Sequence, residues 1–197
     1  MRLSRDVVLD AALRFVDEHG VQALSMRKLG ASLGVEGMAL YYYVPNKDAL
    51  LDGLVERVTE ALTDELPDRE LPWQEWLRRF AHAMRAVLTR HPALLPLLAT
   101  RDVMTPAFLG AFETALEVLG SFQPKQAVHV FNSVTTFVLG HVLAEAGRAG
   151  QHPPEFPGGY PLIARAVAAG AGHDDDAERF DFAIGALLDG FDRRLCT

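Results

Sequence analysis

Apolar residues recur at intervals of three and four along most of this chain, which is the spacing that places them on one face of a helix. The first such repeat includes Val8 and Phe15, begins after Ser4 and ends at Gly20. Serine and glycine are common caps at the N-terminal and C-terminal ends of helices, respectively. The alternation of apolar and polar residues that is typical of strands continues nowhere over a useful length, so the pattern predicts an all-α protein.

Two short helical segments follow the first repeat. Ser25 is the expected cap of a helix that ends at Gly34. Another helix is predicted over residues 36–43, before Pro45, because proline cannot continue a helical hydrogen-bond ladder. Asn46 is the expected cap of a helix over residues 47–63, whose apolar stripe is Leu50, Leu54, Val58 and Leu62. The other predicted helices cover residues 73–91, 93–100, 105–119, 124–146, 161–169 and 176–195.

Two further segments have an unusual composition. Residues 147–160 hold four glycines and three prolines, which predict a turn-rich loop that we expect to be the most disordered part of the chain. Residues 126–144 lack charged side chains but contain too many polar ones for a lipid-facing span. We therefore interpret this run as a helix buried inside protein, and we expect no membrane partner.

Residues 25–47, SMRKLGASLGVEGMALYYYVPNK, have the pattern of a helix-turn-helix. Two short helices are joined by a turn that contains glycine, and in such motifs the second helix enters the major groove of DNA. The second helix opens with small residues, and Gly37 and Ala39 keep its leading face slim enough to approach base edges. The alternative interpretation is a compact helical hairpin whose tyrosines fill a surface groove.

Several side chains of this segment are suited to contact DNA. Met38 and Ala39 can touch thymine methyl groups, and Arg27 can reach a guanine edge or a phosphate. The three successive tyrosines at positions 41–43 cannot all be buried in so short a helix. Their hydroxyl groups can donate to phosphates, as can Lys47, and such contacts set the register on DNA rather than read its sequence.

The formal charge of −7 at pH 7 argues against a polyanionic partner, but it is unevenly distributed. Residues 1–47 carry six Lys or Arg and five Asp or Glu, whereas the other 150 residues carry 13 and 21. The segment that would approach DNA is therefore nearly neutral, and the acidic remainder limits non-specific attraction to DNA. We expect a modest salt dependence per subunit and a reliance on two such segments that bind together.

The stretch over residues 8–62 resembles the N-terminal domain of the TetR family of bacterial transcriptional repressors. The rest of the chain is similar, more loosely, to the C-terminal domain of the tetracycline repressors within that family. The residues that carry the first resemblance are Gly20, Leu24, Arg27, Leu29, Leu33, Gly34, Val35, Leu40, Tyr41, Tyr42, Asn46, Lys47 and Leu50.

This resemblance implies a helix-turn-helix DNA-binding domain in residues 1–46 and an effector-binding and dimerisation domain in residues 47–197, with residues 47–63 as the connector. It implies a homodimer, held by the helices at 124–146 and 176–195, that binds an inverted-repeat operator in double-stranded DNA. A small molecule in the larger domain would move the connector and separate the two DNA-binding domains. By similarity, the DNA-contact positions are Arg27, Gly37, Met38, Ala39, Tyr41, Tyr42, Tyr43 and Lys47.

The effector pocket implied by the resemblance differs at four positions from that of the tetracycline repressors. Thr63 and Leu97 stand where those proteins have histidines, the second of which binds magnesium, and Phe80 and Met84 stand in place of asparagine and phenylalanine. We therefore expect a largely apolar effector and no metal or other cofactor. The predicted pocket residues are Thr63, Phe80, Met84, Leu88, Leu97, Met104, Phe108, Phe112, His129, Phe131, Asn132, Thr135 and Thr136.

Other classes of function find less support in the sequence. Acid-base pairs such as His82 with Glu75 are conceivable, but the motifs of common hydrolases, P-loop proteins and dinucleotide-binding enzymes are absent, so we expect no enzyme. The single cysteine, Cys196, and the lack of an apolar leader indicate a cytoplasmic protein. The sequence thus predicts a ligand-responsive transcriptional regulator, and the alternative is a helical small-molecule-binding or scaffold protein without DNA affinity.

Overall fold

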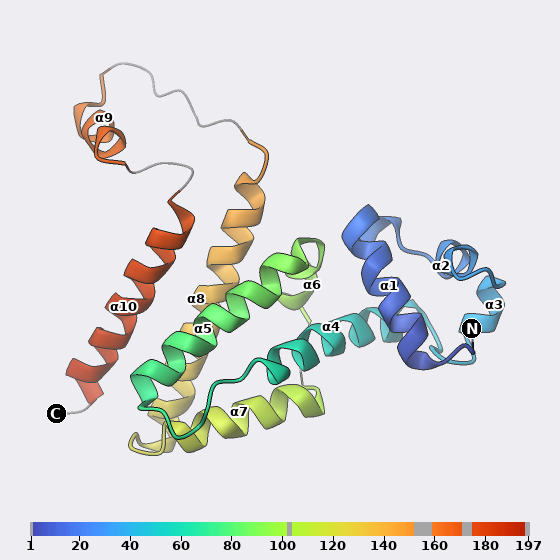
Figure 1. Cartoon of the computed structure of the whole chain (residues 1–197), viewed down its shortest axis with the longest axis horizontal. Coiled ribbons are helices and arrows are strands. Elements are labelled where there is room, and N and C mark those ends of the chain that lie inside the picture. Colours follow the sequence, from blue (N-terminus) through green and yellow to red (C-terminus); the bar gives the residue numbers. More distant parts are fainter. Residues whose placement is uncertain (1, 102–103, 152–158, 171–174, 196–197) are drawn as a thin grey trace.

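The computed structural model describes residues 2–101, 104–151, 159–170 and 175–195, and every regular element within these ranges is a helix, as the sequence predicts. A small lobe contains α1–α3 and the start of α4, and a larger lobe contains α5–α8 and α10 (Figure 1). The elements are α1 (Arg5–His19), η1 (Val21–Ala23), α2 (Met26–Ser32), α3 (Gly37–Leu40), α4 (Lys47–Asp64), α5 (Trp73–Arg90), η2 (Pro92–Leu94), α6 (Leu95–Leu98), α7 (Pro106–Val118), α8 (Pro124–Arg148), α9 (Pro161–Ala168) and α10 (Asp176–Leu195).

The helix caps of the small lobe are those expected from the sequence. The Ser4 hydroxyl accepts a hydrogen bond from the Val7 amide at 3.2 Å, and the Ser25 hydroxyl accepts one from the Lys28 amide at 3.3 Å. Gly20 ends α1 with a φ of 79°, a conformation that favours glycine. These local bonds satisfy amide groups that a helix leaves free at its first turn.

The helix predicted over residues 36–43 is shorter in the structure, so its C-terminal boundary was wrong. After Leu40, which is fully buried, turns replace the regular helix: the Tyr41 amide donates to the Met38 carbonyl, and the Tyr43 and Val44 amides both donate to the carbonyl of Leu40. Pro45 then prevents the helix from continuing, because proline has no amide hydrogen to donate.

A close contact and several ion pairs hold α1 against α4. Gly53 on α4 leaves room for Leu9, since a Cβ atom at position 53 would lie 2.4 Å from a methyl carbon of Leu9. Beside this contact, Arg57 on α4 lies 2.6 Å from Asp6 and 3.3 Å from Asp10 on α1. The part of α4 up to Arg57 is therefore attached to the small lobe.

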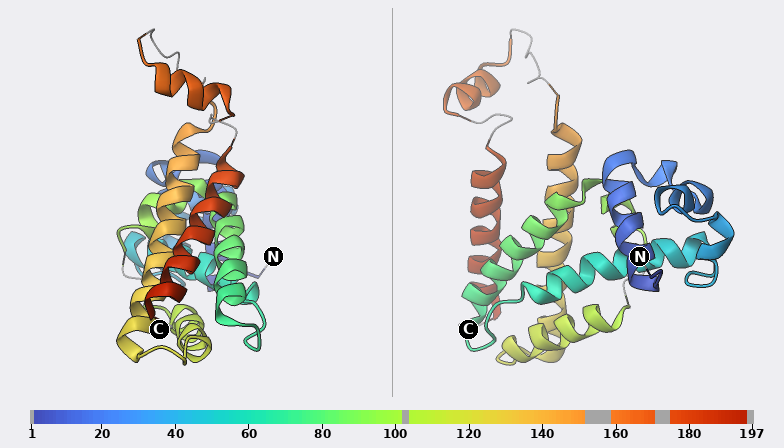
Figure 2. Two further views of the ribbon diagram at one scale, coloured as in Figure 1. Left: turned by 90° about the vertical axis from the view of Figure 1, so that its left-hand side faces the viewer. Right: turned by 45° about the vertical axis from the view of Figure 1, so that its right-hand side comes forward.

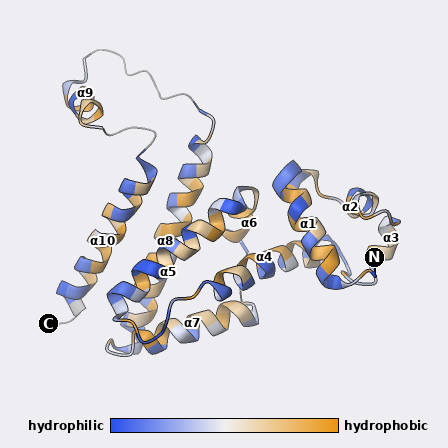
Figure 3. Ribbon diagram, in the orientation of Figure 1, coloured by the Kyte–Doolittle hydropathy of each residue, from blue (hydrophilic) through white to orange (hydrophobic). Residues whose placement is uncertain are grey.

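The larger lobe is built around α8, which packs against α5, α7 and α10. The α10 helix runs beside α8, and α5 contacts both (Figure 2). Hydrophobic and hydrophilic residues alternate along each of these helices (Figure 3). The largest fully buried side chains are Trp76, Phe80, Phe131 and Phe180. Burial of each such side chain is worth about 1.5–3 kcal/mol, so this stack is a major source of stability.

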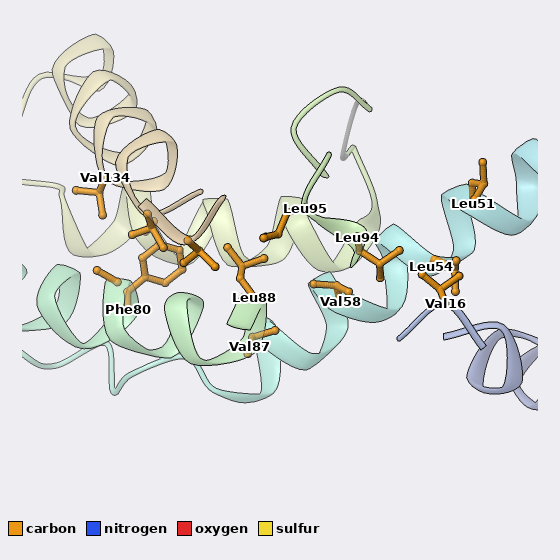
Figure 4. Close-up of a cluster of buried hydrophobic side chains, with 14 of the residues drawn as sticks. Val16, Leu51, Leu54, Val58, Phe80, Val87, Leu88, Leu94, Leu95 and Val134 are labelled. Atoms are coloured by element: carbon orange, nitrogen blue, oxygen red, sulfur yellow. The ribbon is translucent and has the colours of Figure 1, made fainter. Parts of the chain in front are cut away.

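One apolar core continues through both lobes along α4 (Figure 4). Leu54 contacts the small lobe near Val16, whereas Val58, one turn further along α4, lies near Leu88 and Val87 of α5 (Figure 4). The four positions predicted to form the apolar stripe of α4 begin with Leu50, which is also buried. The packing around α4 is therefore continuous from one lobe to the other.

The chain between α8 and α10 includes α9 and most of the predicted turn-rich loop. Residues 152–158 of that loop lie outside the described residues, as do Asp174 and Cys196. The predicted helix over 161–169 is present as α9, and every residue of this helix is exposed. At the start of α10, Asp176 pairs with Arg148 of α8 and with Arg179.

The α8 helix is long and apolar enough to match a membrane span by length and composition, but only a third of its most apolar window is buried within the chain. Its inner face packs through Phe131, Val134 and Val138. Its outer face carries polar residues, such as Asn132 and Ser133, which are poorly suited to lipid. The helix is thus a core helix with a second, polar face that the rest of the described chain leaves uncovered.

Candidate nucleic-acid interface and ligand cavity

The two short helices α2 and α3 cross at a pair of glycines, at the end of the small lobe that is remote from α10 (Figure 1). A Cβ atom on Gly30 would lie 2.8 Å from the backbone nitrogen of Gly37, and a Cβ atom on Gly37 would lie 3.1 Å from the Cα atom of Arg27. Gly37 therefore faces α2, and its lack of a side chain serves this close approach rather than a slim surface toward DNA.

The other predicted DNA-contact residues are mostly exposed. On α3, Met38 is 74% exposed and Ala39 lies beside it, and Tyr42 just after α3 is 87% exposed. Tyr41 is 43% exposed, and Arg27 and Lys47 are also exposed. Tyr43 differs, since it is half-buried against the apolar core and packs edge-on against Tyr42, with ring centroids 5.0 Å apart.

The N-terminus of α4 lies directly after these tyrosines. The Asn46 side-chain oxygen accepts a hydrogen bond from the Ala49 amide at 2.7 Å, so Asn46 caps α4 as predicted. The exposed side chain of Lys47 therefore begins a helix whose dipole attracts anions. This combination suits a phosphate group of a nucleic-acid backbone.

Two acidic residues next to Lys47 are paired with an arginine from the larger lobe. Nη2 of Arg101 lies 3.0 Å from Oδ1 of Asp48, and its Nη1 atom also pairs with Asp52. Burial acts to lower the pKa of Arg101, but the hydrogen bonds to the two carboxylates outweigh it and raise that pKa. Arg101 thus offsets two negative charges beside the candidate phosphate site and joins the chain after α6 to the first two turns of α4.

A second polar contact joins the lobes on the side of α1. Nδ1 of His91, at the end of α5, lies 2.9 Å from a carboxylate oxygen of Asp17 on α1. Between His91 and Arg101 the chain forms η2 and α6, and their residues Leu94 and Leu95 are fully buried. This segment is therefore anchored to the small lobe at both of its ends.

A cavity of about 200 Å³ lies within the larger lobe, where α4, α5, α6, α7 and α8 meet. Leu98 of α6 contributes to its wall, three residues before Arg101. The residues that line it are Val58, Thr59, Leu62, Phe80, Met84, Val87, Leu88, Leu98, Phe108, Ala111, Phe131, Thr135, Thr136 and Leu139.

Seven of the thirteen predicted pocket residues line this cavity: Phe80, Met84, Leu88, Phe108, Phe131, Thr135 and Thr136. Three others lie close behind the wall. Phe112 stacks on Phe131 with ring centroids 5.1 Å apart, the Thr63 hydroxyl donates to the Thr59 carbonyl at 2.9 Å, and Leu97 packs into the core beside Leu98.

The remaining three predicted pocket residues do not line the cavity. His129 and Asn132 lie on the exposed outer face of α8, because residues 131 and 135 occupy the inner face. Met104 precedes α7 and is 67% exposed. The sequence analysis also missed three lining residues on α4: Val58 and Leu62, whose spacing indicated only an apolar stripe, and Thr59.

The fold and these two regions define a class of protein, a DNA-binding regulator with an internal ligand cavity. The family described as bacterial regulatory proteins, tetR family, matches residues 8–54, and the tetracyclin repressor-like C-terminal domain matches residues 66–195. The chain therefore belongs to the TetR family. It is a ligand-responsive, DNA-binding transcriptional regulator.

Individual relatives cover nearly the whole chain. The tetracycline repressor protein class D of Escherichia coli is 30% identical over 98% of this chain and 91% of its own length. The transcriptional repressor DrrR1 of Streptomyces coeruleorubidus is 28% identical over 96% of this chain and 77% of its own length. The similarity thus extends beyond the helix-turn-helix.

Solved structures agree with this assignment. A possible TetR family regulator from Streptomyces coelicolor A3(2) has a TM-score of 0.81 at 27% identity and covers 95% of this chain and 98% of its own. A TetR variant from Acinetobacter baumannii AYE, in complex with minocycline, has a TM-score of 0.78 at 30% identity and covers 98% of both chains.

Proposed function

We propose that the protein is a homodimeric repressor that binds an inverted-repeat operator and leaves it when a largely apolar molecule occupies the cavity. The observation that carries this proposal is the position of α4. Its Gly53 and Arg57 contact α1 of the small lobe, at Leu9 and Asp6, and its Val58 and Leu62 form part of the cavity wall. A ligand that displaces the wall also displaces the DNA-binding surface.

We assign DNA binding to residues 1–46 and effector binding and dimerisation to residues 47–197. The exposed side chains around α3 support the first assignment, and the cavity in the larger lobe supports the second. The DNA contacts are Arg27, Met38, Ala39, Tyr41, Tyr42 and Lys47, with Gly37 and Tyr43 in supporting positions. The repressor names of the relatives and the minocycline complex of one neighbour support both parts of the proposal.

The uncovered faces of α8 and α10 support a homodimer. Phe182 on α10 is 77% exposed and Leu143 on α8 is 42% exposed, and the outer face of α8 between His129 and Leu143 carries no Asp, Glu, Lys or Arg. An isologous contact between two copies would cover these faces with each other and explain why only a third of the apolar window of α8 is buried in one chain. Since the partner is genomic DNA, we place the dimer in the cytoplasm.

We assign the protein no catalytic role. The conceivable acid-base pair of His82 with Glu75 is not formed, because His82 lies 3.1 Å from Asp181 and Glu75 bonds Arg79 at 2.6 Å. Both pairs are on the surface, where ion pairs of this kind are common. Among the described residues, no group of three or more His, Cys, Asp or Glu side chains is placed to hold a metal ion.

The rival function is a helical binding protein without DNA affinity. A mobility-shift experiment with fragments of the genome at low salt separates the two. We expect discrete, salt-sensitive shifts by the dimer for a small number of fragments. If no fragment shifts at low salt, the repressor proposal is wrong and the rival is favoured.

A further inference from the structure

Three aromatic rings stand in the otherwise mostly aliphatic wall of the cavity. Phe80, Phe108 and Phe131 line it, and each is supported by another ring. Trp76 stacks on Phe80 at 5.2 Å with an interplanar angle of 7°, and Phe80 lies 5.3 Å from Phe131. Phe112 supports both Phe108 and Phe131. Ring faces and edges at such spacings favour contact with another flat aromatic system.

In the part of the chain that the structure describes, no charged side chain lines the cavity that could pair with a charge on a ligand. Its lining contains no Asp, Glu, Lys, Arg or His among the described residues. A carboxylate placed there would lose its hydration without gaining a partner, which is strongly unfavourable in an apolar environment. A metal chelate would likewise find no side chain of the usual ligand types in this lining.

The polar atoms of the lining belong to threonines, and two of these already use their hydroxyl hydrogens. Thr59 donates to the Val55 carbonyl at 2.8 Å, and Thr135 donates to the Phe131 carbonyl at 3.1 Å. A hydroxyl group has one hydrogen and two lone pairs, so what each of these side chains still offers is an acceptor. A ligand that meets them must bring a hydrogen-bond donor.

We propose that the effector is an uncharged, flat aromatic molecule with a phenol-like hydroxyl group that donates its one hydrogen to the hydroxyl oxygen of Thr59 or to that of Thr135. This inference rests on the proposed function and specifies the chemistry of its ligand. The size of the cavity agrees with it, because 200 Å³ exceeds the roughly 150 Å³ of an apolar protein cavity that holds benzene. A fused two-ring phenol is therefore a suitable probe.

Calorimetric titration of the DNA-free protein with three naphthalene derivatives tests the proposal. The probes are β-naphthol, its methyl ether, and the naphthalene β-carboxylate at pH 7. We expect β-naphthol to bind about tenfold more tightly than the ether, which lacks the donor, and the carboxylate to bind at least about a hundredfold more weakly. Carboxylate binding equal to that of β-naphthol would overturn the proposal, as would failure of all three probes to bind.

Valine substitutions identify the acceptors. Thr→Val keeps the branched shape but removes the hydroxyl group. In the variant Thr59→Val, Thr135→Val we expect β-naphthol to lose its advantage over the ether, while the affinity for the ether is retained. The matched control is Thr89→Val, an exposed threonine of α5 that donates to the Arg85 carbonyl and does not line the cavity. A preference for β-naphthol that survives the double substitution would refute the assigned contacts.

The comparison of the three probes on the unaltered protein stands even if the double variant does not fold. The outcome is also independent of the DNA experiment. A protein that shifts DNA fragments but binds the carboxylate best remains a regulator with a different effector. A protein that binds β-naphthol as expected but shifts no fragment has the proposed ligand chemistry without the repressor function.

Discussion

Arg101 pairs with Asp48, the residue that directly follows Lys47 at the candidate phosphate site. The two partners are 53 positions apart in the sequence and come from different lobes. Leu98 lines the cavity and Arg101 follows it by three residues, so a short stretch of chain joins the cavity wall to the ion pair beside the candidate phosphate site, and we expect the two to be coupled.

Substitution Arg101→Ala should weaken operator binding in the absence of effector. It leaves the carboxylates of Asp48 and Asp52 unpaired near the phosphates and releases α4 from the chain after α6. A surface ion pair is worth up to about 1 kcal/mol and a dimer has two such sites, so we expect an affinity loss of about tenfold at low salt, measured by fluorescence anisotropy. Arg101→Lys, which keeps the charge, should lose less. Unchanged affinity of Arg101→Ala would refute the link.

Tyr42→Ala and Lys47→Ala should each weaken operator binding and leave the dimer intact. Both side chains are exposed and project from the small lobe. Loss of a phosphate contact by Lys47 should also lower the salt slope by about one per site. The control is Tyr160→Ala, an exposed tyrosine before α9, which should change neither property. If Tyr42→Ala elutes from a sizing column as a monomer, the assignment of dimerisation to residues 47–197 is contradicted.

Gly30→Ala should destabilise the small lobe. The added Cβ atom would lie within 3 Å of the backbone of Gly37 and of the Val35 carbonyl oxygen, and backbone atoms cannot yield as a flexible side chain does. We expect a loss of about 1–3 kcal/mol in the free energy of unfolding, measured by denaturant titration. Gly110→Ala on α7 is the matched control, since a Cβ atom there would meet no neighbouring element within 4 Å, and it should be neutral or slightly stabilising. Equal stability of the two variants would count against the tight α2–α3 crossing.

Ala111→Leu should give a protein that binds its operator but no longer responds to effector. Ala111 is buried and lines the cavity, so a leucine side chain there occupies space that the ligand needs. Anisotropy in the presence of effector should show no release, while operator affinity stays within about threefold of the original. Ala86→Leu, an exposed position on α5, should respond normally. An inducible Ala111→Leu protein would mean that the effector binds elsewhere.

The stability of the larger lobe should fall between pH 7 and pH 5 because of His141. Burial lowers the pKa of this histidine, with Arg85 of α5 acting in the same direction and Glu145 and Asp176 opposing them. The unfolded chain, with a histidine pKa of about 6.5, then binds more protons than the folded chain as the pH drops through that value. Stability is therefore complete above pH 6.5 and declines below it toward the folded pKa.

The variant His141→Phe isolates this effect, since His141 already packs against the rings of Phe137 and Phe180. Its free energy of unfolding should vary less between pH 7 and pH 5 than that of the unaltered protein. The contacts of His82 with Asp181 and of His91 with Asp17 are present in both proteins. Any effect they have on stability is therefore removed when the two pH profiles are compared. Identical pH profiles would exclude His141 as the titrating group.

Local signals predicted most of the helices and their caps. Ser4, Ser25 and Asn46 cap helices as expected, because a cap depends on a side chain and an amide two or three residues away. The role of Gly37 was not predictable, since it depends on the backbone of Arg27 in a neighbouring helix. The partial burial of Tyr43 also depends on tertiary packing.

The cavity was predicted only in part, for a related reason. Both faces of α8 carry polar residues, so periodicity did not reveal that Thr135 faces inward and Asn132 outward. Leu97 and Leu98 are equally apolar, and packing alone selects Leu98 for the wall. The pairing of Arg101 with Asp48 joins residues that no local pattern connects.

The most direct test of the central claim is selection of DNA by the protein from a library of random duplexes, followed by sequencing. We predict enrichment of an inverted repeat whose half-sites are spaced for two helix-turn-helix units on one face of the duplex, and loss of the retained DNA when effector is added. Retention of DNA without any shared sequence, or enrichment that the Tyr42→Ala, Lys47→Ala variant reproduces in full, would contradict the account.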